Sequence, residues 1–130
     1  MLLPPYSPYD PILVISRPKL SGPGTHWGVR FSNGQVADIV NGAGVRLLWN
    51  EEAFAEGRDV TIIREVPVHR DAEIRLRLQM ALQHPRPYHP TQWNCEMFAN
   101  WLVGEKPDSP QVQGWAILAV AAAVAHVFGS

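Results

Sequence analysis

A tight turn between two strand-like runs is the feature that most limits how this chain can fold. Residues 26–31 and 35–40 each read as a short strand, and Asn33-Gly34 lies between them. Asn-Gly readily adopts the positive φ angles of a tight hairpin turn. Because side chains alternate between the two faces of a strand, the usual hairpin register can bring His26 of the first strand close to Asp38 of the second.

The remaining segments favour further strands and helices, which predicts an α+β fold. Strands are expected at residues 12–16 and 60–66, because both are short and β-branched. Residues 70–82 carry apolar side chains at the spacing of one helix face, and a second helix is expected from Cys95 to about Val103, before Gly104. We therefore expect a small antiparallel sheet with packed helices.

Proline and apolar content divide the chain into three parts. Residues 1–11 hold four prolines and are expected to form an extended N-terminal segment, whereas residues 12–108 form the compact domain. Residues 109–130 are expected to form an additional apolar helix. Its almost wholly apolar stretch, residues 115–128, would span ~21 Å, which is less than the ~30 Å hydrocarbon core of a membrane. This helix is expected to pack on the domain, or to serve as an oligomer contact or a peripheral membrane contact.

Charge and cysteine content exclude several classes of protein. The chain has 11 basic and 12 acidic side chains and no extended basic run, so we expect no nucleic-acid partner. One cysteine allows no intramolecular disulfide, and the first residues lack the pattern of a secretion signal. These features predict a cytoplasmic protein, either free or membrane-associated through its last helix.

The single cysteine, Cys95, is the candidate nucleophile. Thr91 or Asn94 can cap a helix that begins at this point. A thiol in the first turn of a helix faces unpaired backbone N–H groups and the positive end of the helix dipole, and both favour the thiolate. A cysteine nucleophile also needs a base, for which His26 is the candidate, with Asp38 as the carboxylate that orients it.

A metal site is the competing interpretation of the same cysteine. His84, His89 and Cys95 lie five and six residues apart, which fits no standard zinc motif, and prolines interrupt the segment. We therefore expect no metal and no cofactor.

Three motifs in this order resemble the lecithin:retinol acyltransferase-like family. They are His26-Trp27-Gly28-Val29, a polar residue twelve positions after that histidine, and Asn94-Cys95-Glu96-x-Phe98. The tail that follows them, Asn100-Trp101-Leu102-Val103-Gly104 and then Ser109-x-Gln111-Val112, is similar to that of its bacterial members. The resemblance covers residues 12–112. It implies a circularly permuted relative of papain-like and NlpC-type cysteine peptidases, in which a small antiparallel sheet carries the histidine and the cysteine helix packs against it.

The resemblance also implies a role for each matching residue. Cys95 would be the nucleophile, His26 the general base, and Asp38 the third residue, where animal members often have a second histidine. Met97 stands where the family motif commonly has histidine. The implied activity is acyl transfer or hydrolysis through a thioester on Cys95, with phospholipid esters or another acyl-bearing small molecule as the donor.

Residues near the cysteine are the candidates to stabilise the oxyanion of such a reaction and to contact its substrate. The backbone N–H of Cys95 would bind the oxyanion, and the candidates for further oxyanion or substrate contacts are Gln92, Trp27, Asn94 and Tyr88. Two other functions stay open. One is a cysteine amidase or peptidase of the NlpC type, and the other is a non-catalytic interaction module that binds its partner through residues 115–128.

Overall fold

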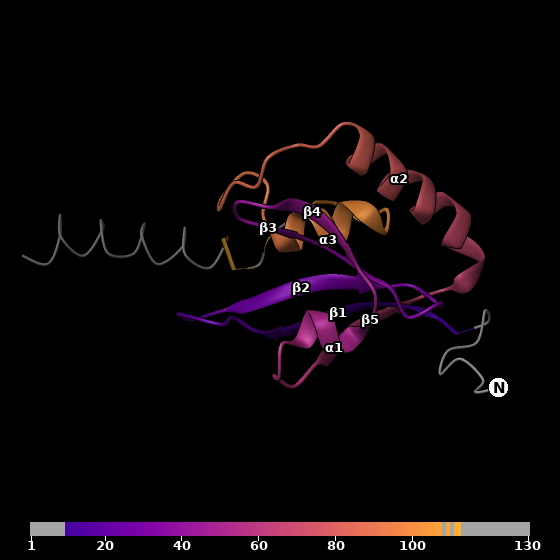
Figure 1. Cartoon of the computed structure of the whole chain (residues 1–130). Helices are drawn as coiled ribbons and strands as arrows, with labels where there is room; N and C mark the ends of the chain where they lie inside the picture. The colour runs from indigo at the N-terminus through magenta and orange to yellow at the C-terminus, as the bar shows by residue number, and fades with distance from the viewer. Residues whose placement is uncertain (1–9, 108, 110, 113–130) are drawn as a thin grey trace, which may run out of the picture.

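The computed structural model describes residues 10–107, 109 and 111–112 (Figure 1). The extended segment predicted at the N-terminus falls almost wholly outside the described residues, and so does the apolar helix predicted over residues 109–130, including its apolar stretch 115–128. Among the helices that the structure does describe, none has the length and apolar character needed to cross a membrane.

The fold is α+β, built on one antiparallel sheet of five strands in the order β4-β3-β2-β1-β5. The predicted hairpin is β2 and β3, and its turn is closed by a hydrogen bond of 2.8 Å from the backbone N–H of Phe31 to the carbonyl of Gln35. Gly34 has a φ of 89°, the left-handed conformation predicted for it, whereas Asn33 does not have the positive φ that was also expected. The strands are β1 (Ile12–Pro18), β2 (Thr25–Arg30), β3 (Val36–Val40), β4 (Gly44–Leu48) and β5 (Thr61–Val66).

Three helices cover the two faces of this sheet. The short α1 (Glu51–Ala55) lies on one face, and α3 (Cys95–Leu102) lies on the other with α2 (Asp71–Gln83) outside it (Figure 1). A short 3-10 turn, Val68–Arg70, leads into α2. The small antiparallel sheet with packed helices that the sequence predicts is therefore confirmed, and most observed boundaries fall within two residues of the expected ones.

Each face of the sheet has its own hydrophobic core because the strand side chains alternate. Val14, Val29 and Ile39 face α3 and pack with its buried residues, whereas Leu13, Ile15, Val36 and Phe54 form a smaller cluster on the side of α1. His26 lies opposite Arg17 of β1, and both extend to the α1 side. Asp38 follows Val36 by two residues, so it shares this face.

Strands β2 and β3 pair only near their turn. The paired residues are Val29 with Ala37 and Arg30 with Val36, and no pair is formed farther along β2, toward His26. Consequently the backbone groups of Thr25 and Trp27 that point toward β3 are left for other partners. Because this break in pairing lies between β2 and β3, it leaves an opening within the sheet, along the side of β2 that faces β3.

Candidate active site

His26 and Asp38 form a buried pair. The imidazole Nε2 lies 2.7 Å from Oδ2 of Asp38, and the two residues are 8% and 0% exposed. The Phe54 ring stacks on the imidazole with 5.4 Å between ring centroids. Since Asp38 takes Nε2, the other ring nitrogen, Nδ1, is the one available to accept a proton.

Arg46 completes the surroundings of Asp38. It lies directly opposite Asp38 on β4 and donates two hydrogen bonds, from Nε to Oδ1 at 2.9 Å and from Nη2 to Oδ2 at 2.6 Å. Burial alone would raise the pKa of Asp38, but the hydrogen bonds from Arg46 and His26 outweigh it, so the pKa lies below its ordinary value. The carboxylate is therefore ionised at neutral pH, as an orienting group for an imidazole must be.

Arg17 and Gly28 hold the Phe54 ring against His26. Arg17, which is 4% exposed, donates from Nε to the backbone carbonyl of Phe54 at 2.6 Å. A Cβ atom at Gly28 would lie 2.8 Å from the Phe54 ring, so only glycine permits this close approach to the sheet. The imidazole is thus fixed on one side by a carboxylate and on another by an aromatic face.

Cys95 is the first residue of α3, and Asn94 is the N-cap. The Asn94 side chain accepts a hydrogen bond of 3.1 Å from the backbone N–H of Met97, which is the capping contact expected of this residue type. Of the two caps that the sequence allowed, the structure therefore uses Asn94 rather than Thr91. The Cys95 side chain is buried, with the residue 4% exposed.

The Cys95 thiol occupies the opening at the edge of β2. Its Sγ lies 3.9 Å from the carbonyl oxygen of Thr25 and receives a hydrogen bond from the backbone N–H of Trp27. These two groups belong to the peptide units on either side of His26. The thiol therefore packs where β3 would otherwise continue its ladder with β2.

The structure thus brings two of the three predicted catalytic residues into direct contact and places the third against the backbone of the strand that carries His26. His26 and Asp38 meet on the α1 side of the sheet, whereas Cys95 enters from the α3 side. Among the described residues, the hydrogen bonds of the thiol are with backbone groups of β2 and of α3, and not with the imidazole. The thiol therefore contacts the peptide groups that flank His26 and not its side chain.

The expectation that the start of α3 favours a thiolate is wrong for this state. Burial is the largest effect and raises the pKa of the Cys95 thiol, and the charge of Glu96 raises it further. Hydrogen bonds from the backbone N–H groups of Trp27 and Glu96, and the charge of Lys19, act in the opposite direction but do not reverse the shift. The resting thiol is therefore neutral, because burial destabilises the thiolate more than the backbone N–H groups at the start of α3 stabilise it.

This shift predicts a slow alkylation of Cys95 in the folded protein at neutral pH. The folded pKa lies above the unfolded value of about 8.5, so the rate should rise only in alkaline solution, above that value. By linkage, the neutral thiol contributes to the free energy of unfolding below pH about 8.5, the pKa of the unfolded chain. This contribution is lost as the pH rises through the pKa of the folded chain. The measurement is the rate of iodoacetamide addition by intact mass against pH, with the urea-unfolded chain as the control. A folded midpoint below that of the unfolded chain would contradict it.

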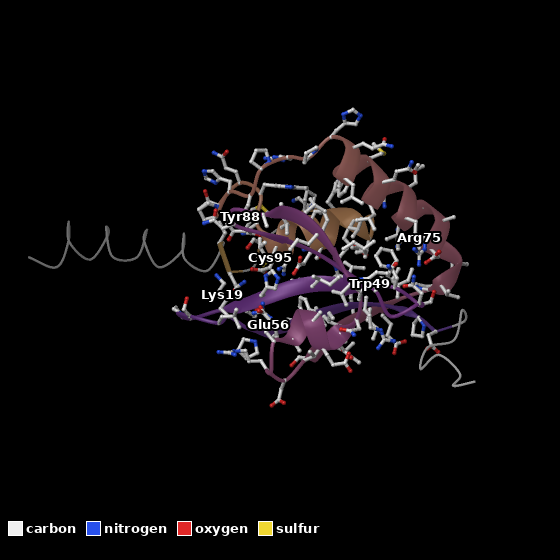
Figure 2. The ribbon with its side chains drawn as sticks, in the orientation of Figure 1. Lys19, Trp49, Glu56, Arg75, Tyr88 and Cys95 are labelled. Atoms are coloured by element: carbon white, nitrogen blue, oxygen red, sulfur yellow. The ribbon has the colours of Figure 1, made fainter. Side chains whose placement is uncertain are left out.

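A cavity of about 420 Å³ lies beside Cys95, which is the one residue of the proposed triad among its described lining residues. Figure 2 shows Tyr88 above and Lys19 below Cys95 at this end of the molecule. Tyr88 and Asn94, both predicted as substrate contacts, line the cavity. The described residues that line it are Lys19, Tyr88, Pro90, Thr91, Asn94, Cys95, Glu96, Gln111 and Val112.

The other two predicted contact residues lie elsewhere. Gln92 is exposed and is not part of the cavity wall; its backbone N–H donates to Nδ1 of His89 and its carbonyl accepts from Arg86. Trp27 contributes its backbone N–H to the thiol, while its indole donates to Oγ1 of Thr25 at 3.1 Å. Gln92 is thus not placed to bind an oxyanion, because it is exposed and lies outside the wall that its neighbours Thr91 and Asn94 form.

A buried polar network that the sequence did not predict supports the cavity floor. Glu96 is 1% exposed and accepts hydrogen bonds from the Ser109 hydroxyl at 3.0 Å and from the Gln111 amide. Gln111 also bridges Thr25, accepting from its N–H at 2.9 Å and donating to its carbonyl at 3.2 Å. The Ser109-x-Gln111 pattern enters the sequence analysis only through the family resemblance, and it does not predict these contacts because they join residues far apart in the chain.

The metal interpretation finds no support in the part of the chain that the structure describes. His89 uses Nδ1 to accept backbone hydrogen bonds from Thr91 and Gln92, which stabilises the turn before α3. Within residues 10–107, 109 and 111–112, no group of three His, Cys, Asp or Glu side chains could hold a metal ion.

Comparisons of the sequence and of the structure with known proteins found no matching family model, no matching curated protein and no matching solved structure.

Proposed function

We propose that this chain is a thiol-dependent acyltransferase or hydrolase of the lecithin:retinol acyltransferase-like type. Cys95 is the nucleophile, His26 the general base and acid, and Asp38 the residue that orients His26. The observation that carries the proposal is that both Asp38 and the Cys95 thiol contact residue 26 or the peptide groups that flank it. Asp38 holds its imidazole at 2.7 Å, and the thiol contacts the peptide groups on both sides of it.

The proposed fold is the permuted papain-like arrangement that the motifs imply. Its support is the order of the elements: the histidine lies on β2, the third residue on β3, and the cysteine at the start of a helix that packs against β2. Catalytic triads are defined by geometry and role, so a histidine that precedes the cysteine in the chain is compatible with this chemistry.

In the proposed reaction, Nδ1 of His26 takes the proton of the Cys95 thiol, and the thiolate attacks the acyl carbonyl carbon. The new C–S bond forms as the carbonyl oxygen becomes an oxyanion. The tetrahedral intermediate then collapses, the bond to the leaving group breaks, and His26 returns the proton to it. Water or another acceptor loses a proton to His26, attacks the thioester and releases the acyl group. Because the resting thiol is neutral, proton transfer accompanies attack.

Two groups are suited to bind the oxyanion. The backbone N–H of Cys95 is in the first turn of α3, where helix geometry provides no partner for it. Tyr88 lines the same cavity, and burial raises the pKa of its phenol, which keeps the hydroxyl protonated and able to donate. We therefore replace Gln92 by Tyr88 as the side-chain candidate.

The proposed donor is a lipid ester, and an amide is the second candidate. The lipid assignment follows from the motif resemblance alone. The observation that favours an amide is the set of polar residues beside the thiol, Thr91, Asn94, Glu96 and Gln111, although most of the wall area is apolar. These groups could bind the donors and acceptors of a peptide-like substrate.

The test is the search for an acyl adduct on Cys95. The protein is incubated with a phospholipid, an activated ester and an acyl amide, and each reaction is followed by intact mass and peptide mapping, with Cys95→Ala as the control. An adduct from the phospholipid supports the lipid function, and an adduct from the amide without one from the phospholipid supports the amidase. Absence of any adduct at Cys95 with all three donors, from neutral to alkaline pH, would overturn the proposal.

A further inference from the structure

A second cavity, of about 360 Å³, lies between β4, α2 and α3 and shares no lining residue with the cavity at Cys95. Its volume is in the range of small-molecule sites, ~300–1,000 Å³. The proposed thiol chemistry gives it no role. Its lining residues are Val45, Met80, Ala81, His84, Arg86, Trp93, Trp101 and Pro107.

The walls of this cavity are mainly apolar and aromatic. Trp93 is 8% exposed and meets Trp101 edge to face, with 6.0 Å between ring centroids and 69° between planes. Met80 is 51% exposed at the rim, although it belongs to a helix that packs on the domain. A flexible thioether beside two fixed indole rings can adapt to an apolar chain.

Arg86 gives the cavity a cationic rim. Its guanidinium lies over the Trp93 ring, 4.6 Å from the centroid, and donates a hydrogen bond of 3.2 Å to the carbonyl of Gln92. A guanidinium has five N–H donors, so this contact leaves donors for a ligand. Among the described residues that line the cavity, none is acidic. The charge of the site therefore complements an anion.

We propose that this cavity binds a free carboxylate with a single apolar chain. The chain lies between Trp93, Trp101 and Met80, and the carboxylate pairs with Arg86. A carboxylate suits this position because a guanidinium can donate two parallel hydrogen bonds to its two oxygens. The proposal is independent of the thiol chemistry, because it uses a different cavity and needs no reaction.

The test is a titration of the ¹⁵N-labelled full chain with decanoate, decanol and decyltrimethylammonium, each below its micelle concentration. The indole N–H signals of Trp93 and Trp101 are followed. Decanoate should shift both signals saturably, decanol should bind more weakly, and the cation should bind most weakly. Equal binding of all three probes, or no saturable shift with decanoate, would overturn the proposal.

Arg86→Gln separates charge recognition from apolar binding. Removing a charged hydrogen-bond donor should weaken decanoate binding about tenfold and leave decanol binding unchanged. Arg58→Gln is the matched control, since Arg58 is exposed and follows α1 on the opposite face of the sheet. Trp101→Ala should weaken both probes, with thermal unfolding measured to establish that each variant is folded. Equal decanoate affinity in Arg86→Gln and Arg58→Gln would contradict the assignment.

Discussion

Replacing His26 by alanine should slow acylation of Cys95 by about 10²–10⁴-fold, the range for loss of a general acid–base group. The effect should be near the upper end, because burial holds the thiol neutral and attack requires a base at neutral pH. The measurement is the single-turnover release of a chromogenic leaving group from an activated ester. The loss should shrink as the pH rises, since hydroxide then supplies the thiolate directly.

The control for this experiment is His69→Ala, which removes an exposed histidine from the 3-10 turn before α2. It should react like the parent. His26→Gln gives a second comparison, because an amide can still hydrogen-bond to Asp38 but cannot take a proton. Equal rates in His26→Ala and His69→Ala would show that the imidazole is not the base. A fast His26→Gln would show that position 26 contributes structure alone.

The part of the site that the sequence could predict is the part built by local interactions. Asn33-Gly34 sets the turn and hence the register of β2 and β3, so the approach of Asp38 to His26 follows from two adjacent strands. The cap at Asn94 is likewise a contact within one helical turn. Short-range rules apply to both because few other parts of the fold influence them.

The rest of the site depends on contacts between distant segments. Arg46 reaches Asp38 because β4 pairs with β3 in the register that sets the two residues opposite each other. The turn between these two strands determines that register, and the residue pattern of the sequence did not predict it. Gln111 meets Thr25 across 86 residues of sequence. The thiol's environment is also a tertiary property: a helix start can be identified from residue types, but the burial that raises the pKa of Cys95 arises from the packing of α3 on β2.

Replacing Asp38 by alanine should lower the free energy of unfolding by about 3 kcal/mol at neutral pH. This is the low end of the range for breaking a buried ion pair, because Arg46 is 32% exposed and can recover water. Asp38→Asn should cost less, since it keeps the shape and one acceptor oxygen. Urea unfolding measures both, and Asp59→Ala, at an exposed position, is the control.

The pH dependence distinguishes lost charge from lost packing. The folded pKa of Asp38 is lowered, so its stabilisation is present above the unfolded value of about 3.9 and is lost as the pH falls through the folded value. The difference between parent and Asp38→Asn should therefore be largest near neutral pH and shrink in acid. A constant difference would mean that the carboxylate acts through shape. Because the same charge orients His26, Asp38→Asn should slow acylation more than its loss of stability can explain.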